Sequence, residues 1–284
     1  ENSCRISIDD SSQFASALML CAKVSGWNVE VVGNNADESP YVTMTSELCK
    51  VFPANGGEFQ IEPDASSASY FHAANAVAPS KNLPPTPIES GFLVGVVPSE
   101  VVQYSTIEIA HQPKSGWQVD ERYPQISLYL EKSEVSRQRD LGDSIMTAIV
   151  LAPITAWSFP PGNQIRFTDL ARLRVQECER VIALRTELTK CGAKVFEEGD
   201  TLTVHASRPH GAEIETYNDH RMAMCFAVLG LKVPGIKIRN PACVKKTFPN
   251  FFQKLAAPPP NGLGVEIRDG RTGRKLGTDE LFAE

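Results

Sequence analysis

Apolar residues recur at helical spacing in four segments, and each segment follows residues that commonly cap helices. These predicted helix starts lie at Ser11, Asp64, Asp143 and Asn218. Serine, aspartate and asparagine side chains accept hydrogen bonds from the free N–H groups of a first helical turn. For any one helix, ordinary capping explains the pattern. Four such ends accompanied by arginines favour anionic ligands, because a helix start carries unpaired N–H groups and a partial positive charge.

A second pattern predicts a repeated α/β unit. A helix ends at Cys191-Gly192, and two short apolar runs follow, Ala193–Phe196 and Leu202–Val204, separated by an acidic turn. This order is typical of a helix, a glycine stop and a β-hairpin. Looser copies of the unit are predicted around residues 114–130 and 48–61. Their recurrence favours a fold built from α/β repeats.

Proline-rich stretches at residues 79–87, 160–162 and 258–260 separate these units and predict loops, since proline lacks a backbone donor. After Pro260 the chain becomes rich in glycine and charge. Residues 258–284 are therefore predicted to be a linker or a loosely held tail.

The composition narrows the classes of function. A chain of 284 residues predicts two lobes, and its net charge of −6 disfavours a broad nucleic-acid surface. The apolar stretch Ile145–Trp157 is too short to span a bilayer, and no charged, apolar leader is present, so no membrane partner and a cytoplasmic location are expected. Seven cysteines without a CxxC pair indicate free thiols and no metal site. The first residue is Glu1 rather than Met, which suggests a fragment or a processed product.

Three charged segments are candidates for chemistry. Glu177 and Arg180 stand three residues apart at the start of a predicted helix, where spacing alone favours a solvated ion pair over an acid beside an anion-binding cation. Arg221 adds positive charge to the positive end of its helix, which is easier to explain if an anion binds beside it. Lys245-Lys246 would by itself be a surface charge pair.

Taken together, three motifs closely resemble those of the 5-enolpyruvylshikimate-3-phosphate (EPSP) synthase family. They are Asp64-Ala65-Ser66-Ser67-Ala68-Ser69-Tyr70-Phe71, Tyr217–Met224 and Lys246-Thr247-Phe248-Pro249. Ser11–Phe14 and Glu177–Arg180 fit the same pattern in the same order, so the resemblance runs from Ser11 to Leu255. It implies transfer of the enolpyruvyl group from phosphoenolpyruvate to the 5-hydroxyl of shikimate 3-phosphate, with release of phosphate and without a cofactor.

The resemblance also implies a fold. It is α/β, with two lobes of repeated βαβαββ units and the active site between them. This chain would supply part of one lobe in residues 1–61 and a nearly complete second lobe in residues 62–257, before the tail at 258–284. The N-terminal region of the family is missing, so a separate N-terminal half is a possible partner and the isolated chain is expected to be inactive or weakly active.

Roles for individual residues follow from the same resemblance. Ser11 and Ser12 would bind the sugar phosphate, Gln13 would bridge the two substrates, and Tyr41 would pack on the shikimate ring. Asp143 would accept the proton of the attacking hydroxyl, and Glu177 would exchange a proton at the enol methylene. Arginine suits both anions of phosphoenolpyruvate. The residues implied to hold them are Arg180, Arg221 and Lys246.

Three positions depart from the family pattern. Gln176 replaces a lysine, Arg172 replaces an asparagine that is often found there, and Glu38 replaces a serine. Arg172 could restore the cation lost at Gln176, whereas Glu38 would repel a phosphate. Two alternatives therefore remain beside the leading function: a UDP-sugar enolpyruvyl transferase and a non-catalytic member of the family. The Asp219–Met224 run and Lys246–Pro249 favour the leading function over the first alternative.

Overall fold

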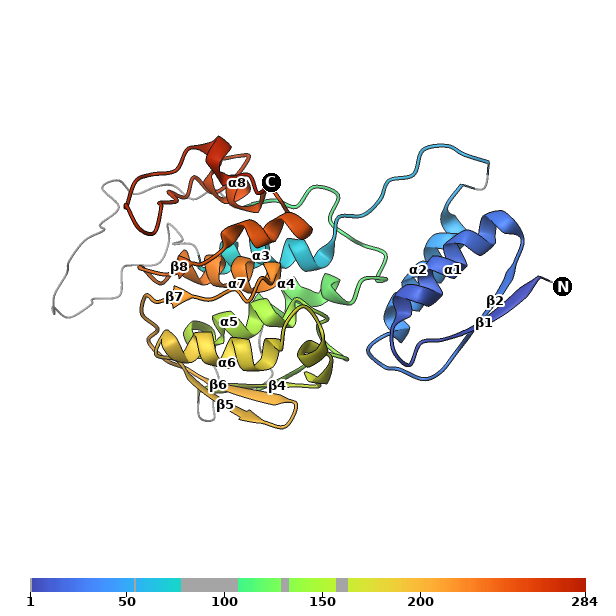
Figure 1. The fold of residues 1–284 in the computed structure, drawn as a ribbon, viewed down its shortest axis with the longest axis horizontal. Coiled ribbons are helices and arrows are strands. Elements are labelled where there is room, and N and C mark those ends of the chain that lie inside the picture. The colour runs from blue at the N-terminus through green and yellow to red at the C-terminus, as the bar shows by residue number, and fades with distance from the viewer. Residues whose placement is uncertain (1, 54, 78–106, 129–132, 157–162) are drawn as a thin grey trace.

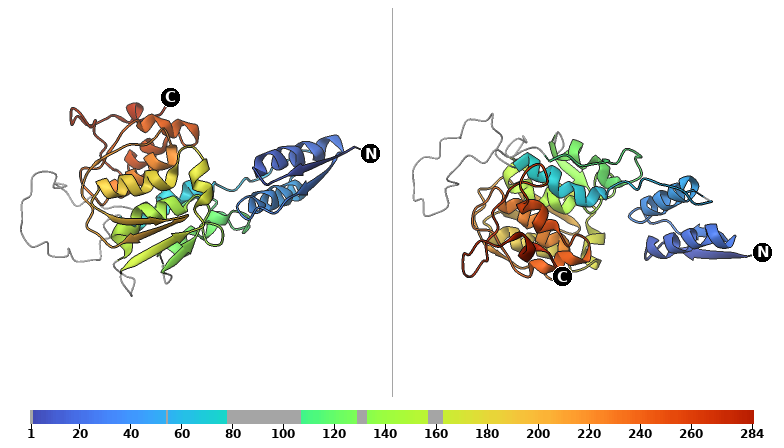
Figure 2. Two further views of the ribbon diagram at one scale, coloured as in Figure 1. Left: turned by 60° about the horizontal axis from the view of Figure 1, so that its bottom comes forward. Right: turned by 90° about the horizontal axis from the view of Figure 1, so that it is seen from above.

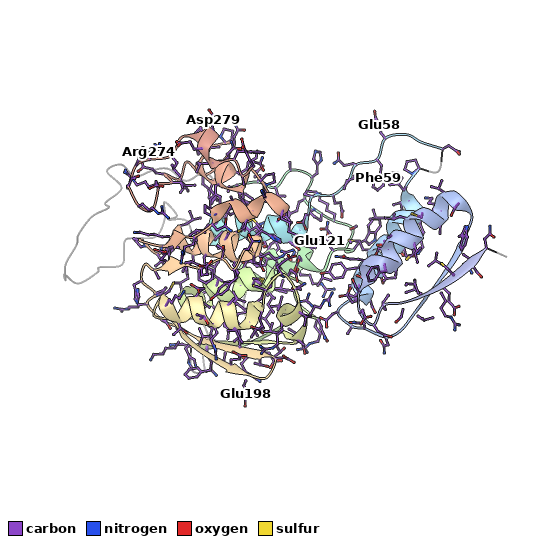
Figure 3. The ribbon with its side chains drawn as sticks, viewed as in Figure 1. Glu58, Phe59, Glu121, Glu198, Arg274 and Asp279 are labelled. Carbon is purple, nitrogen blue, oxygen red and sulfur yellow. The ribbon has the colours of Figure 1, made fainter. Side chains whose placement is uncertain are left out.

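The computed structural model describes residues 2–53, 55–77, 107–128, 133–156 and 163–284. A small N-terminal unit stands beside a larger body in each view (Figures 1 and 2), and an extended segment that includes Glu58 and Phe59 joins the two (Figure 3). The fold therefore places the chain's first 51 residues on one side of the body.

The N-terminal unit is a βαβα arrangement. Its elements are β1 (Ser3–Ser7), α1 (Ser12–Ser25), β2 (Asn28–Val32) and α2 (Ser39–Val51). The strands pair in parallel, with Ser3 opposite Asn28. Ser11 caps α1 by accepting a hydrogen bond from the Gln13 amide, and Gly26 ends the helix in the left-handed conformation. The predicted helix start at Ser11 is confirmed.

The outer side of α1 is apolar and open to solvent. Phe14 is 64% exposed, Val24 is 91% exposed, and Trp27, just after the helix, is 48% exposed. A two-stranded sheet covers only part of such a helix. Within the described ranges, nothing buries these three side chains.

The body is built around one complete βαβαββ unit. Its elements are β3 (Glu134–Ser136), α5 (Ile145–Thr155), β4 (Gln164–Thr168), α6 (Arg180–Lys190), β5 (Lys194–Glu198) and β6 (Thr201–His205). The strand order is β3-β4-β6-β5, parallel between β3 and β4 and antiparallel elsewhere. The β5–β6 hairpin is confirmed, and Glu198 lies at its outer end (Figure 3).

The other elements of the body cover this unit. The helices are α3 (Ala65–Val77), α4 (Tyr123–Leu128), α7 (His220–Gly230) and α8 (Phe251–Ala256), and the strands are β7 (Glu213–Ile214) and β8 (Lys237–Ile238). Short 3₁₀ helices form at η1 (Val119–Arg122), η3 (Ala171–Val175), η4 (Pro241–Lys246) and η5 (Thr278–Leu281). The strands β7 and β8, which precede and follow α7 in the sequence, pair in parallel.

Helix α5 forms the centre of the core. Its residues from Ile145 to Pro153 are all buried, as expected for a helix that is apolar on every side. Helices α3 and α7 pack on it, and a hydrogen bond of 3.2 Å joins Ser69 of α3 to Thr147 of α5. Thr147 in turn lies 3.5 Å from the Cys225 sulfur of α7. The packing therefore aligns three helix starts at one edge of the body.

Two strand predictions are wrong. Residues 119–128 form η1 and α4 rather than strands, because Pro124 suits the first turn of a helix and cannot donate to a sheet. Residues 39–51 form α2, and the described residues from 55 to 61 form no strand, since two glycines in positive-φ conformations interrupt the run. Part of the first region, residues 129–132, and the proline-rich stretches at 79–87 and 160–162 lie outside the described residues.

The C-terminal segment differs from the expected loose tail. Leu263, Leu281 and Ala283 are buried, and the Ala283 amide donates to the Pro249 carbonyl at 2.9 Å. Well-spaced apolar residues thus hold a polar, glycine-rich segment on α8. Arg274 and Asp279 of this segment project outward from the body (Figure 3). In the described part of the chain, no helix is long and apolar enough to cross a membrane.

Candidate active site

Asp143 lies at the centre of the candidate site, immediately before α5. Its carboxylate is 2.9 Å from Nη2 of Arg137, 3.4 Å from Nε of Arg221 and 3.6 Å from Nη1 of Arg180. Arg137 directly follows β3, Arg180 is the first residue of α6 and Arg221 is the second residue of α7, so three separate elements converge on one aspartate. We call Arg137, Arg180 and Arg221 the arginine cluster.

The arginine cluster fixes the charge of Asp143. Burial alone would raise the pKa of this carboxyl group. The positive charges of Arg221, Arg137 and Arg180 outweigh burial and hold its pKa well below the usual range. Asp143 is therefore ionised at neutral pH and is a weak base while all three arginines face it.

Asp120 holds the loop that presents Asp143. Its buried carboxylate accepts hydrogen bonds from the Gly142 amide at 2.7 Å and from the amide and hydroxyl of Ser144. The Ser66 hydroxyl at the start of α3 donates to the other oxygen. Since Gly142 and Ser144 flank Asp143, one carboxylate sets the backbone position of another.

Asp219 positions two of the arginines. It caps α7 by accepting from the Arg221 amide at 2.8 Å, and Nε of Arg180 donates to it at 2.6 Å. Asp219 is fully buried. Burial tends to raise its pKa, but the hydrogen bond and charge of Arg180 lower it overall. Asp219 therefore balances a guanidinium that is itself only 2% exposed.

His220 is a neutral imidazole beside this pair. Burial, followed by the charge of Arg221, lowers its pKa from 6.5 to about 4. A protonated imidazole would add a further cation to the arginine cluster. The histidine thus fills space without adding charge at neutral pH.

The stability of the chain is expected to fall in mild acid because of His220. Between pH 6.5 and about 4 the unfolded chain binds a proton at this residue and the folded chain does not. The free energy of unfolding therefore decreases as the pH falls through this window, by about 2 kcal/mol after allowance for solvent screening. Urea unfolding at pH 7 and pH 4.5 measures the loss. His220→Gln cannot titrate, so an equal loss in this variant would contradict the assignment to His220.

Glu177 pairs with Lys246. The two groups come from the segment between η3 and α6 and from the end of η4, and the Lys246 ammonium donates to the Glu177 carboxylate. Both residues are exposed. The prediction that Glu177 and Arg180 share a helix is wrong: α6 begins at Arg180, and Glu179 caps it by accepting from the Ile182 amide.

Gln176 occupies the edge of the arginine cluster. Its amide oxygen accepts from Nη1 of Arg180, and its amide nitrogen lies 3.5 Å from both oxygens of Asp143. The neutral side chain thus bridges an anion and a cation. Arg172 does not reach this position, because it lies in η3 and pairs with Glu38 at 3.0 Å.

The start of α1 forms a second part of the site. Ser12 is buried and its amide donates to the Glu38 carboxylate at 2.6 Å, whereas Gln13 is exposed. Asp37, next to Glu38, forms an ion pair with Arg137 of the arginine cluster. Two consecutive acidic residues therefore connect the α1 start to the surroundings of Asp143.

Tyr41 lies close to this Asp37–Arg137 ion pair. It lines a small cavity together with Asp37, Arg137 and Gly142. Burial and the charge of Asp143 raise the pKa of its phenol. The structure therefore brings Tyr41, Asp143, Arg180 and Arg221 together, with the Glu177–Lys246 pair and the Ser11–Ser12 segment as separate groups.

Three contributors were not among the predicted site residues: Arg137, Asp120 and Asp219. Arg137 carried a sequence signal, because it belongs to the charged run Ser136–Asp140 between a strand and an apolar helix. Asp219 was predicted only as a helix cap. Across the described residues, no group of three or more His, Cys, Asp or Glu side chains could hold a metal ion.

The architecture has a counterpart among solved structures. An EPSP synthase from Acinetobacter baumannii matches with a TM-score of 0.54 and 19% sequence identity, over 92% of this chain and 63% of that chain. The likeness establishes the two-lobed α/β fold of the enolpyruvyl transferases.

Sequence comparison gives the family. The family model for EPSP synthase (3-phosphoshikimate 1-carboxyvinyltransferase) matches residues 50–255, and the chain therefore belongs to this family. Relatives named 3-phosphoshikimate 1-carboxyvinyltransferase include proteins of Pseudomonas syringae pv. tomato (32% identical over 291 residues) and Rhizobium etli (33% identical over 293 residues). Each alignment covers 93% of this chain and 61% of the relative. The chain thus spans about 61% of the length of these relatives, and the UDP-sugar alternative is not favoured.

Proposed function

We propose that the chain takes part in transfer of the enolpyruvyl group from phosphoenolpyruvate to the 5-hydroxyl of shikimate 3-phosphate, with release of phosphate. The observation that carries the proposal is the arginine cluster around Asp143, to which α6 and α7 each contribute a residue of their first turn. A cluster of this kind suits a donor with two anionic groups, because each guanidinium can bind an oxyanion in a two-pronged manner.

Binding of the donor would change the base strength of Asp143. In the free chain Arg180 and Arg221 face this carboxylate. Once the phosphate and carboxylate of phosphoenolpyruvate pair with these two arginines and with Lys246, less positive charge acts on Asp143. Its pKa then rises toward the ordinary range, and the group can accept the proton of the attacking hydroxyl.

Glu177 would perform the second proton transfer. Its carboxylate is exposed and contacts Lys246, one of the proposed donor-binding cations. It would give a proton to the methylene carbon as the hydroxyl oxygen bonds to the neighbouring carbon. It would take a proton back from the methyl group as phosphate leaves. Lys246 donates a hydrogen bond to this carboxylate and would hold it near the donor.

The acceptor would lie between α1 and Asp143. Ser11 and Ser12 would bind its phosphate at the start of α1, Gln13 would reach the donor, and Tyr41 would pack on its ring. Tyr41 supports this placement, because it lies in the cavity next to Arg137 while the charge of Asp143 acts on its phenol.

A separate N-terminal half would complete the site. Under this proposal residues 1–61 belong to the first lobe and residues 62–257 to the second, and the protein acts in the cytoplasm. The apolar side chains exposed on α1 support a missing neighbour, since Phe14 and Val24 face solvent in the chain described here.

Phosphate release is the test. The chain alone is expected to give little or none from phosphoenolpyruvate and shikimate 3-phosphate. Addition of the N-terminal portion of the Pseudomonas syringae relative is expected to give turnover. Arg239 forms an exposed ion pair outside the arginine cluster, so Arg239→Ala should leave that turnover unchanged. Absence of turnover in a complex shown by co-purification to have formed would oppose the proposed function, and turnover by the chain alone would oppose the need for a second half.

A further inference from the structure

The Glu38 carboxylate is seated on the start of α1. One oxygen accepts from the Ser12 amide at 2.6 Å, and the other lies 3.0 Å from Nε of Arg172. Glu38 is only 4% exposed. Nη1 of Arg172 also donates to the Asp10 carbonyl at 3.4 Å, which holds the guanidinium against the residues that precede the helix.

This arrangement has the charge pattern of an anion that is already bound. The first turn of α1 offers an amide N–H and the positive end of the helix dipole, and Arg172 offers a guanidinium. The Glu38 carboxylate already occupies both the Ser12 amide and the Arg172 guanidinium. Any other anion that approaches Ser12 meets the negative charge of Glu38 first.

We propose that Glu38 is a specificity-determining residue of the acceptor site: its carboxylate occupies the place of the acceptor's anionic group and competes with it for Ser12 and Arg172. The proposal rests on the proposed function, which puts the acceptor phosphate at the start of α1. A phosphorylated acceptor binds only by displacing Glu38, so the chain favours phosphorylated acceptors less than a chain with a neutral residue at this position.

Two variants separate the charge of Glu38 from its hydrogen bond. Glu38→Gln keeps an oxygen that can accept from the Ser12 amide but removes the negative charge. Glu38→Ser removes both and empties the position. Glu47→Gln is the matched control, because it removes a half-exposed carboxylate of the same helix that pairs only with Lys50 in the described contacts.

Calorimetric titration of the full chain with inorganic phosphate and with shikimate 3-phosphate tests the proposal. Both Glu38 variants are expected to bind each ligand at least about tenfold more tightly than the wild type, since a like charge next to the ligand is removed. Glu47→Gln should bind like the wild type. In Glu38→Ser the Arg172 guanidinium is released from Glu38 and can bind the ligand. A further Arg172→Ala change in that variant should therefore abolish the gain.

Equal or weaker binding by both variants overturns the proposal, as does failure of every variant to bind either ligand. A gain for inorganic phosphate without one for shikimate 3-phosphate also overturns it. Thermal unfolding of Glu38→Gln confirms that the titrated protein is folded. The titrations need no turnover, so a failure of the proposed reaction in the completed enzyme is distinguishable from a failure of this proposal.

Discussion

Replacement of Asp143 by asparagine is expected to abolish measurable phosphate release in the completed enzyme. Loss of a general base of this kind lowers the rate by about 10²- to 10⁴-fold. The amide cannot take up the proton of the attacking hydroxyl, although it has nearly the same shape. The effect is therefore expected in kcat rather than in the affinity for the acceptor.

The same change is expected to weaken the fold. Arg137 and Arg180 have side chains that are 3% and 2% exposed, and Asp143 neutralises part of their charge. Removal of one partner from a buried ionic network typically costs about 3–5 kcal/mol, because the remaining charges stay buried without compensation. Urea unfolding of Asp143→Asn beside the exposed control Asp279→Asn measures this cost.

An anion should partly rescue the variant. Phosphate or phosphoenolpyruvate can supply the negative charge that Asp143→Asn lacks, and a ligand of the folded state raises its stability by mass action. The melting temperature of the variant should therefore rise more with added phosphate than that of the wild type. Near-normal turnover, or no extra stabilisation by phosphate, would remove Asp143 from its proposed place at the centre of the site.

Replacement of Asp219 by alanine is expected to give the second-largest effect. Arg180 would lose the partner to which its Nε donates at 2.6 Å, and α7 would lose its cap at Arg221. A broken buried pair costs about 3–5 kcal/mol, and a lost helix cap costs about 1 kcal/mol more. The variant should also bind phosphoenolpyruvate poorly, because Asp219 positions both Arg180 and Arg221.

An exposed ion pair provides the comparison for Asp219→Ala. Arg239 and Glu213 pair at 3.3 Å with side chains about 60% exposed, and Glu213→Ala should cost less than about 1 kcal/mol. In a double-mutant cycle, Arg180→Met should recover part of the stability lost in Asp219→Ala, since it removes the uncompensated charge. Losses that simply add would show that the two side chains act independently.

Local features of the fold were predictable from the sequence because they depend on short-range physics. The helix starts at Ser11, Asp64 and Asp219 follow from capping, and the hairpin at residues 194–205 follows from alternation around an acidic turn. Helix α5 begins just after Asp143 as predicted, but no side chain of the described residues caps it, because the Asp143 carboxylate pairs with arginines instead. The helix that was expected to contain both Glu177 and Arg180 does not include Glu177, because α6 begins only at Arg180. Spacing cannot reveal that the chain turns between η3 and α6, where tertiary contacts override helix propensity.

Long-range contacts account for what the sequence alone did not reveal in the site. The family resemblance named Asp143, Arg180 and Arg221, but the ion pair of Arg137 with Asp37 joins residues 100 positions apart. No periodic pattern encodes such a pairing. Glu38 was recognised as a departure, and only the structure shows that its carboxylate faces Ser12 and Arg172 rather than solvent.

The half-exposed indole of Trp27 gives the N-terminal unit a built-in optical signal. Its ring lies just after α1, at the end of the helix whose apolar side faces water. A polypeptide that covers this side would move the indole into a less polar environment. Its fluorescence emission would then shift to shorter wavelength, and acrylamide would quench it less. Binding of the proposed N-terminal half could thus be followed in real time without a label.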